Sequence, residues 1–438
     1  MAAASDLRDW ILTLIENGMS PGEKLPGARR IAARFGCSLP VVQGVLDSLE
    51  QSGVVGSRAR SGTFVREGFR DRLLPRNAVC GPFFRVLSDG QKKQFRRAFP
   101  DMHLSDVFRT GGAEILSTFT ILSRQRNYQD LAPVFDACFP DCEKRFYMDS
   151  LKPFRIEGRL CAVPILFSPQ ILWYNPAVFR EKGVPEPRAD WGGKEFFSAL
   201  RALHRELSGR RIINYSPAFR HWIGFILAAG GALFDPGCAD PVRVDSPETE
   251  AACSKYLALL RELDLAADFN TEPEKAFAEG KMAMFAGFRQ SGFFFRACGM
   301  DFTPGAVCMP DLGGGVNHQG AALLAFRKGI FSDEEIGRML KFWLSPSLQE
   351  TFGKSGYGVP FLRRAAEKTL DGTSEPDRTL LAHMPPLSSN YHICSEELGS
   401  IVSRSSALIN TSPPGELPRL LGELGTVMRY IIKLKRRN

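Results

Sequence analysis

The 438-residue sequence predicts a mixed α/β protein with a small helical unit at its N-terminus. Two observations predict this class. Amphipathic helical patterns and an alternating, turn-rich stretch fill the first 65 residues or so, and short apolar runs then alternate with helical patterns as far as the C-terminus. Because 438 residues exceed what one ordinary hydrophobic core accommodates, we expect two or three folding units.

The first predicted element is an amphipathic helix in the stretch LRDWILTLIENG. Its apolar residues recur at i, i+3, i+4, i+7 and i+8, which gathers them on one helix face, and Gly18 can end the helix. The residues on this face are Leu7, Trp10, Ile11, Leu14 and Ile15.

A second and a third helix follow after a loop that contains two prolines. The stretch ARRIAARFG predicts a short helix that buries apolar side chains and stops at Gly36. Ser38 then caps a third helix, in which Pro40 is tolerated because it falls in the first turn. The predicted buried residues are Ile31, Ala32 and Phe35 in the second helix and Val41, Val42, Val45, Leu46 and Leu49 in the third.

The stretch VVGSRARSGTFV alternates and turns over between Gly56 and Gly62, which predicts a two-stranded wing. Together with the three helices, it resembles the winged helix-turn-helix of the GntR family of bacterial transcription regulators. The resemblance covers residues 6–66 and is carried by PGEKLPGARRIAARFGCS and VLDSLEQSGVVGSRARSGTFV. It implies that a domain over residues 1–66 binds double-stranded DNA.

Basic side chains dominate this segment: seven lysines and arginines lie between Lys24 and Arg66, against Asp47 and Glu50. Such an excess suits phosphate contacts. By the resemblance, Arg29 matches the family's phosphate-binding arginine, and Arg58 and Arg60 lie where the wing approaches DNA. The full set of predicted DNA-binding residues is Arg29, Ser38, Leu39, Pro40, Gln43, Arg58, Arg60 and Thr63.

The third helix departs from the family pattern, which usually places arginines where this chain has Leu39 and Gln43. Gln43 can still pair with adenine through two hydrogen bonds, and Leu39 and Pro40 can lie against thymine methyl groups, which favours A·T-rich half-sites. The alternative is that this helix face no longer reads DNA and that the domain only dimerises or docks.

Several function classes find no support in the sequence. It contains no nucleotide-binding loop, nucleophile elbow or zinc-protease motif, its six histidines are dispersed, and its ten cysteines lack paired spacing. We therefore expect no enzyme, no catalytic residue, no metal site and no cofactor, and we expect reduced thiols. The net charge of +8 is too mild to indicate a partner.

The N-terminus carries charges where a secretory signal would be apolar, and no stretch is long and apolar enough to span a membrane. These features predict a cytoplasmic protein without a membrane partner. Residues 67–79, which are charged and contain a proline, are expected to form a linker to a second domain over residues 80–438.

Four stretches of this second domain resemble the extracellular solute-binding proteins of carbohydrate ABC importers, the maltose-binding-protein-like group. They are GRLCAVPILFSPQILWYNPAVFREKGVPEP, LAAGGALFDPGCADPVRVDSPETEAACSKYLALL, AFAEGKMAMFAGF and LLAFRKGIFSDEEIGRMLKFWLSPSLQETFGKSGYGVP. The resemblance implies a periplasmic-binding-protein-like fold of two α/β lobes that clasp a sugar or oligosaccharide. The first lobe should take roughly residues 80–165 and 312–352.

Sugars stack their C–H faces on aromatic rings and present hydroxyl groups to polar side chains. By the motif positions, the expected ligand-binding residues are Ser168, Gln170, Trp222, Phe288, Arg289, Tyr357 and Tyr391. For each of them, packing in the core is the alternative.

The two resemblances together predict a one-component regulator in which a sugar in the cleft changes DNA binding by a homodimer. A second hypothesis is a cytosolic solute-binding or scaffold protein whose winged helix contacts only proteins. A third is an enzyme that acts on a bound sugar, which would require a pair of carboxylates facing the cleft. The nearest candidates, which have a loop-like context, are Asp235, Asp240 and Asp245.

Overall fold

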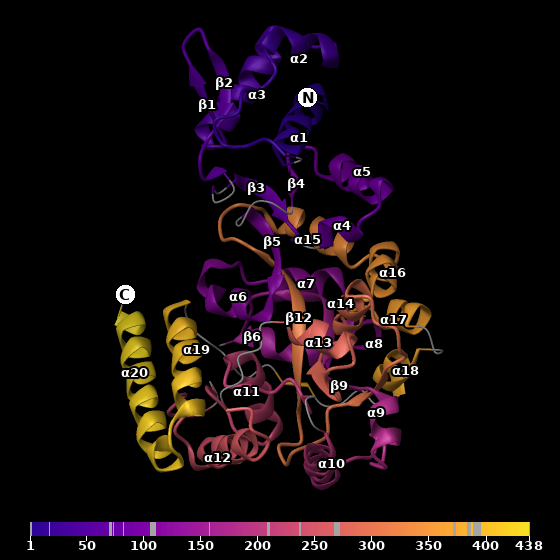
Figure 1. Ribbon diagram of the computed structural model, residues 1–438. Helices are drawn as coiled ribbons and strands as arrows, with labels where there is room; N and C mark the ends of the chain where they lie inside the picture. Colours follow the sequence, from indigo (N-terminus) through magenta and orange to yellow (C-terminus); the bar gives the residue numbers. More distant parts are fainter. Residues whose placement is uncertain are drawn as a thin grey trace. The chain divides into compact units, whose positions relative to one another are not determined.

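The computed structural model describes the chain apart from residues 1, 17, 70–71, 73, 82, 106–110, 157, 208–210, 236–237, 267–271, 371–373, 383–386, 389–395 and 438. The chain divides into two compact units, each built from three chain segments (Figure 1). Unit 1 comprises Met1–Leu116, Asn127–Gln129 and Leu323–Leu348, and unit 2 comprises Ser117–Arg126, Asp130–Ala322 and Gln349–Asn438.

Unit 1 begins with three helices and a hairpin, as the apolar spacing predicts. The elements are α1 (Ala2–Glu16), α2 (Ala28–Phe35), α3 (Leu39–Gln51), β1 (Val55–Arg58) and β2 (Gly62–Val65). The strands pair antiparallel from Val55↔Val65 to Arg58↔Gly62. Leu7, Ile11 and Ile15 of α1 are fully buried in the core of this domain.

Helix boundaries in this domain follow the predicted signals, with one local difference. Gly36 ends α2 in the left-handed conformation, at a φ of 58°. Ser38 occupies the N-cap of α3, but its side chain makes no capping hydrogen bond. The reason lies in its neighbours: Pro40 has no N–H to offer, and the N–H of Val41 donates to the backbone carbonyl of Ser38 at 3.1 Å.

The predicted linker over residues 67–79 is shorter than expected, because its last six residues form β3 (Leu74–Val79). This strand pairs in parallel with β4 (Leu104–Ser105) and β5 (Gly111–Ser117). Phe69, also within the predicted linker, is 1% exposed and belongs to the core of the winged-helix domain. The charged residues of this stretch suggested a loop, whereas the structure buries Phe69, Asn77, Ala78 and Val79.

A buried carboxylate lies in the middle of β5. Glu114 is fully buried and accepts hydrogen bonds from the Tyr128 hydroxyl at 2.6 Å and from Arg327 Nη2 at 3.1 Å. Arg327 Nε also donates to the carbonyl of Gly111 at 3.0 Å. This network joins all three chain segments of unit 1. Besides α1, α2 and α3, the helices of unit 1 are α4 (Phe83–Val86), α5 (Asp89–Ala98) and α15 (Asp333–Trp343).

Unit 2 draws its strands from sheets of two, three and seven strands. In one sheet β9 (Ile171–Tyr174) lies between β10 (Met284–Gly287) and β11 (Gly305–Cys308), antiparallel to both. β8 (Val163–Pro169) is buried along its whole length and pairs antiparallel with β13 (Val359–Pro360). Two further pairings join β6 (Arg155–Ile156) to β7 (Arg159–Leu160), antiparallel, and β12 (Asn317–Phe326) to β14 (Leu387–Ser388), parallel.

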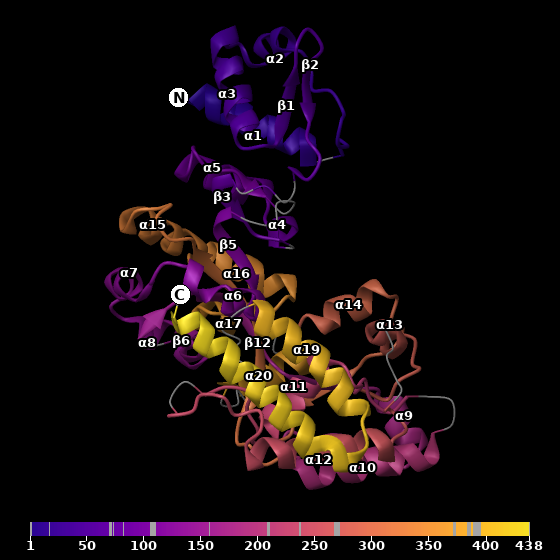
Figure 2. The ribbon, with the colours of Figure 1, turned by 90° about the vertical axis from the view of Figure 1, so that its left-hand side faces the viewer.

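Helices cover these strands. They are α6 (Thr118–Ser123), α7 (Ala132–Cys138), α8 (Cys142–Arg145), α9 (Pro176–Glu181), α10 (Gly193–Glu206), α11 (Phe219–Ala228), α12 (Pro247–Glu262), α13 (Pro273–Ala278), α14 (Ser291–Ala297), α16 (Pro346–Ser355), α17 (Arg363–Thr369), α18 (Glu375–Ala382), α19 (Glu396–Thr411) and α20 (Leu417–Arg437). Figures 1 and 2 show α19 and α20 side by side as a helical hairpin. Both helices contribute to the same core as α11 and α12.

The predicted first lobe does not coincide with unit 1, since residues 130–165 and 312–322 belong to unit 2. One reason is that β8 is held by β13, which comes from a much later part of the chain. The chain passes from unit 2 into unit 1 within β12, between Ala322 and Leu323.

Candidate functional site

The predicted DNA-binding residues lie on the surface of the winged-helix domain. Leu39, Pro40 and Gln43 are exposed along the first turns of α3, and Leu39 has 46% of its surface exposed. An apolar side chain this open at a helix start is available to a partner. Gln43 Nε2 donates to Asp47 Oδ1 at 2.8 Å, so one face of its amide is engaged within the helix.

The wing presents its basic residues to solvent. Arg58 is exposed and holds its guanidinium 4.7 Å from the centroid of the Phe64 ring, which stabilises its orientation. Arg60 lies in the turn at a φ of 61° and is exposed, as is Arg29 on α2. Thr63 is half-buried opposite Ser57 in the hairpin.

Trp222, predicted as a stacking surface for a sugar, lies in the core of unit 2. Its fractional exposure is 0%, so it presents no indole face to a ligand. The cause is local sequence: residues 222–228 of α11 are apolar or glycine, and all of them are buried. Trp222 packs against Phe219, with 6.1 Å between their ring centroids.

Arg289, also predicted to bind ligand, has a guanidinium group whose hydrogen bonds go to other residues of the protein. Its guanidinium forms two hydrogen bonds with Asp377, at 2.6 and 3.0 Å, and Nη1 donates to the carbonyls of Gly353 and Gly358 at 2.8 and 2.9 Å. Both charged side chains are about nine-tenths buried. Arg289, which follows β10, is thus buried and hydrogen-bonded to α16 and α18, and it does not lie at the surface.

The other predicted ligand residues that the structure describes have three different surroundings. Ser168 accepts a hydrogen bond from the backbone N–H of Arg289 at 3.0 Å, which places it beside the half-buried Phe288. Tyr357 stacks near Phe293, with 5.1 Å between centroids. Gln170 is buried, and its amide packs against Gly224 of α11. Tyr391 lies outside the described residues.

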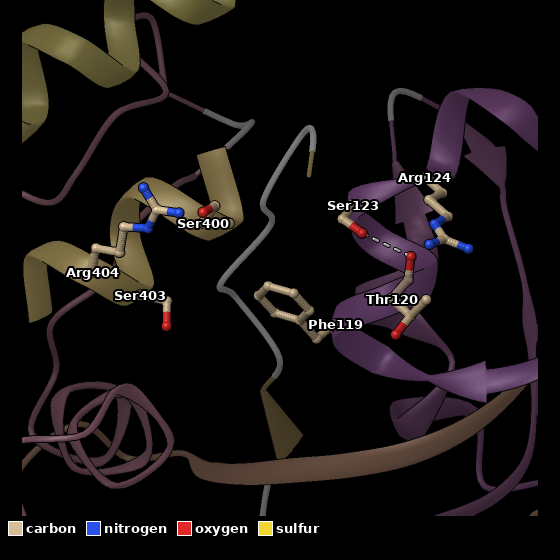
Figure 3. A pocket seen from close by; sticks show the side chains of 8 residues that line it. Phe119, Thr120, Ser123, Arg124, Ser400, Ser403 and Arg404 are labelled. Carbon is tan, nitrogen blue, oxygen red and sulfur yellow. Dashed lines mark hydrogen bonds between the residues drawn. The ribbon is translucent and has the colours of Figure 1, made fainter. Parts of the chain in front are cut away.

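A cavity of about 460 Å³ lies elsewhere in unit 2, between α6 and α19 (Figure 3). None of the predicted ligand residues that the structure describes lines it. The lining residues are Phe119, Thr120, Ser123 and Arg124 on the α6 side and Gly399, Ser400, Ser403 and Arg404 on the α19 side. Ligand pockets typically have volumes of roughly 300–1,000 Å³.

Helical spacing explains why each helix offers these side chains. On α6, Ile121 and Leu122 are fully buried, while Thr120 and Arg124 lie one turn apart. On α19, buried residues such as Leu398 and Val402 face the core. Ser400 and Arg404 are spaced by four residues and therefore share a different face, toward the cavity.

Phe119 connects this cavity to the core. Its ring centroid lies 6.3 Å from that of Phe219, which in turn packs on Trp222. Trp222 is therefore two aromatic layers behind the cavity wall. Sequence reasoning missed the cavity residues, although pairs of hydroxyl and arginine side chains one helical turn apart in STFTILSR and SIVSRSS were an available signal.

The three aspartates considered for catalysis are engaged in structural contacts. Arg429 of α20 forms ion pairs with Asp240, at 2.7 Å from Nε, and with Asp245, at 2.7 Å from Nη1. Asp235 accepts a hydrogen bond from the Cys238 thiol at 3.2 Å. These carboxylates hold α20 and a loop in place and do not line the cavity.

Within unit 1, α1 of the winged-helix domain is joined to the following α/β region by polar contacts, of which the one between His103 and Asp9 is buried. His103 Nδ1 lies 2.6 Å from Asp9 Oδ1, and Arg96 Nη1 lies 3.1 Å from Asp9 Oδ2. Arg8, next to Asp9, donates to the carbonyl of Asp101 at 3.3 Å, and burial lowers the pKa of its guanidinium. We call these residues (Arg8, Asp9, Arg96, Asp101 and His103) the α1 junction.

The described ranges offer no candidate for a membrane span or a metal site. No helix there is both long and apolar enough to cross a bilayer. No group of three or more His, Cys, Asp or Glu side chains in those ranges is placed to hold a metal ion.

Comparison with known families matches both parts of the chain. Residues 2–65 match the model of the bacterial regulatory proteins of the gntR family, and residues 122–378 match that of bacterial extracellular solute-binding proteins. The two predicted resemblances are thereby confirmed, as is the predicted fold class.

Solved structures with a similar fold include three ligand complexes. UgpB from Mycobacterium tuberculosis with glycerophosphocholine is 19% identical, with 83% of this chain and 99% of that chain covered and a TM-score of 0.64. The substrate-binding protein Lmo0181 from Listeria monocytogenes with cycloalternan is 16% identical, with 83% and 100% covered and a TM-score of 0.63. Maltose-bound MalE3 from T. maritima is 14% identical, with 82% and 100% covered and a TM-score of 0.63. At these identities the likeness concerns the fold.

Proposed function

Because the chain belongs to the bacterial extracellular solute-binding protein family and begins with a gntR-type regulatory domain, we propose that it is a ligand-responsive, DNA-binding transcription regulator. One observation carries the proposal: a chain with an exposed basic wing also contains a cavity of about 460 Å³ in its solute-binding part. The wing supplies phosphate contacts, and the cavity supplies a place for an effector.

The effector that we propose is a sugar or oligosaccharide bound between α6 and α19. Phe119 offers an aromatic face to the C–H groups of a sugar ring, and four hydroxyl side chains are available to its hydroxyl groups. The hydroxyl residues are Thr120, Ser123, Ser400 and Ser403. Similar folds holding maltose and cycloalternan support this ligand class.

A continuous series of chain connections and hydrogen bonds leads from α6 to the winged helix, which supports coupling between ligand binding and DNA binding. β5 runs directly into α6 in the chain, β5 pairs with β3, and the backbone N–H of Ala78 in β3 donates to the carbonyl of His103 at 2.9 Å. His103 belongs to the α1 junction. We infer that a ligand which binds two arrangements of α6 with different affinities shifts the DNA-binding state through this route.

On DNA we propose that Arg29, Arg58 and Arg60 contact the backbone or groove edge, while Ser38, Leu39, Pro40, Gln43 and Thr63 approach the bases. One winged helix contacts too little DNA for physiological affinity, so we propose a homodimer on a pseudo-palindromic site. Such a regulator acts in the cytoplasm, where the DNA is, and needs neither catalysis nor a cofactor.

The test is selection of fragments from random genomic DNA by the full-length protein, with and without maltose and other candidate sugars. We expect enrichment of fragments with two-fold related half-sites, and an altered affinity for them when a sugar is added. Light scattering should report a dimer on these fragments.

If no fragment is enriched, the regulator proposal fails, and the winged helix serves protein contacts in a solute-binding or scaffold protein. The engaged Gln43 amide and the small number of base-edge donors on α3 are the features that favour that alternative. If fragments are enriched but no sugar changes their affinity, the protein binds DNA and the proposal that it senses a sugar fails.

A further inference from the structure

We propose that the ligand of the cavity between α6 and α19 is an anionic polyol, in which a phosphate group is attached to a sugar or to glycerol. This ligand class rests on the proposed function, because it concerns the effector of the same cavity. It adds a phosphate group to the sugar or oligosaccharide of the proposed function.

The charge of the cavity wall is the first argument. Two of the eight lining residues are arginines, Arg124 and Arg404, and none of the eight is an aspartate or a glutamate. Arginine binds phosphate through paired, charge-assisted hydrogen bonds, and its planar fork matches the oxygen spacing. A cavity wall of guanidinium and hydroxyl groups without a carboxylate therefore suits a phosphate ester together with the hydroxyls of its polyol.

The second argument compares Arg404 with other arginines of unit 2 that have carboxylate partners. Arg289 is bound to Asp377 and two backbone carbonyls, Arg429 to two aspartates, and Arg201 to Glu262 at 2.6 Å. Each of these cations has a carboxylate partner. Arg404, in contrast, makes no hydrogen bond or ion pair with any described residue of the chain, and it is exposed at the cavity.

The helical register brings a second donor to the same point. Ser400 precedes Arg404 by one turn of α19, so its hydroxyl lies on the same helix face (Figure 3). Ser403 lies beside them. A hydroxyl donor and a guanidinium one turn apart can bind different oxygens of a single phosphate, while Phe119 on the opposite wall faces the carbon skeleton.

The experiment measures binding to the full-length protein by titration calorimetry. The probes are D-glucose 6-phosphate and sn-glycero-3-phosphocholine, with D-glucose, maltose and glycerol as neutral counterparts. We expect at least one phosphate-bearing probe to bind about tenfold or more tightly than its neutral counterpart, as is typical for a hydrogen bond to a charged group. The two phosphate arms distinguish a sugar monoester from a glycerol diester.

The variant that tests the site is Arg404→Gln, which removes the charge from an exposed side chain. It should weaken binding of the phosphate-bearing probe about tenfold and leave the binding of its neutral counterpart within about twofold. Lys433→Gln on α20, which loses one positive charge from an exposed position outside the cavity, is the matched control. Unchanged circular dichroism should show that Arg404→Gln folds.

Equal affinity for phosphorylated and neutral probes, or no loss of phosphate binding in Arg404→Gln, overturns the ligand class. If maltose binds and changes DNA affinity while both phosphates are inert, the proposed function stands and this inference fails. If a phosphate probe binds through Arg404 but leaves DNA affinity unchanged, this inference stands and the regulatory function fails.

Discussion

His103 and Asp9 are 94 residues apart in the chain, yet Nδ1 of the imidazole lies 2.6 Å from Oδ1 of the carboxylate, and both side chains are buried. A buried carboxylate is costly unless it is hydrogen-bonded, so the contact holds α1 firmly to the α/β region that follows it. This is the position at which we expect the coupling of the two functions to be most easily broken.

We expect Asp9→Asn to leave ligand-free DNA binding within about threefold of the original protein and to reduce the change in DNA affinity that ligand causes. The reason is that the replacement keeps the size of the side chain but loses its charge at the α1 junction, at a stability cost of about 1–3 kcal/mol. Parallel DNA titrations with and without maltose measure this effect. Asp6→Asn, an exposed change on the same helix, is the control, and a ligand response of full size in Asp9→Asn would contradict the route.

Arg29→Ala should weaken binding to all DNA sequences alike and reduce the slope of log affinity against log salt by about one unit, because it removes one phosphate contact. Binding titrations at several salt concentrations on specific and random DNA measure this. A loss confined to the specific site would show that Arg29 reads bases instead.

Gln43→Ala should relax the sequence preference at one position by about 1–3 kcal/mol, if its amide leaves Asp47 to pair with adenine. Fragment selection with the variant measures the preference. An unchanged preference would assign the reading of sequence to the wing or to DNA shape.

Phe119→Ala should mainly lower ligand affinity, whereas Trp222→Ala should mainly lower folding stability. Phe119 lines the cavity and is half-buried, so its removal should cost about 1–3 kcal/mol of ligand affinity with little change in melting temperature. Trp222 is fully buried, so its removal should cost about 3–5 kcal/mol of folding stability. Thermal melting and ligand titration on the two variants separate these effects, and equal melting temperatures would contradict the assignment.

The buried thiols should resist alkylation in the folded protein. Burial raises the pKa of Cys253 to about 12, from an ordinary value near 9, so at pH 8 the reactive thiolate is about a thousandfold rarer than in an unperturbed thiol. Burial raises the pKa of Cys161 to about 12 as well. Mass spectrometry after iodoacetamide treatment should find Cys298, which is exposed, labelled first. Rapid labelling of Cys253 before unfolding would show that the core opens.

Local patterns predicted the winged-helix domain because each of its helices is defined by its own apolar spacing. Leu7, Ile11 and Ile15 are buried as that spacing requires. The same reasoning could not place Trp222, since an aromatic residue in an apolar helix has the same local sequence whether it faces a cleft or a core. The burial of residues 221–228 in α11 is a tertiary property.

The hydroxyl–arginine pairs of the cavity could be seen in the sequence, but their meeting in one cavity could not, for a similar reason. Arg124 and Arg404 come from helices far apart in the chain, and only the packing of α6 and α19 makes them walls of one space. Arg289 shows the reverse error: a charged residue after a family motif suggested a ligand contact, and its true partner, Asp377, lay in a segment with no recognisable signal.

The ion pair between Glu114 and Arg327 sets an order of events during protein synthesis. The two residues are 213 positions apart, and ribosomes add about 5–20 residues per second, so the arginine emerges roughly 10–40 s after its partner. The first 79 residues, which contain the whole core of the winged-helix domain, are complete long before that. A nascent chain therefore carries a complete winged-helix domain while the region to which we assign effector binding is still unfinished, and a chain cut short in this interval would have the proposed DNA-binding surface without the proposed effector control.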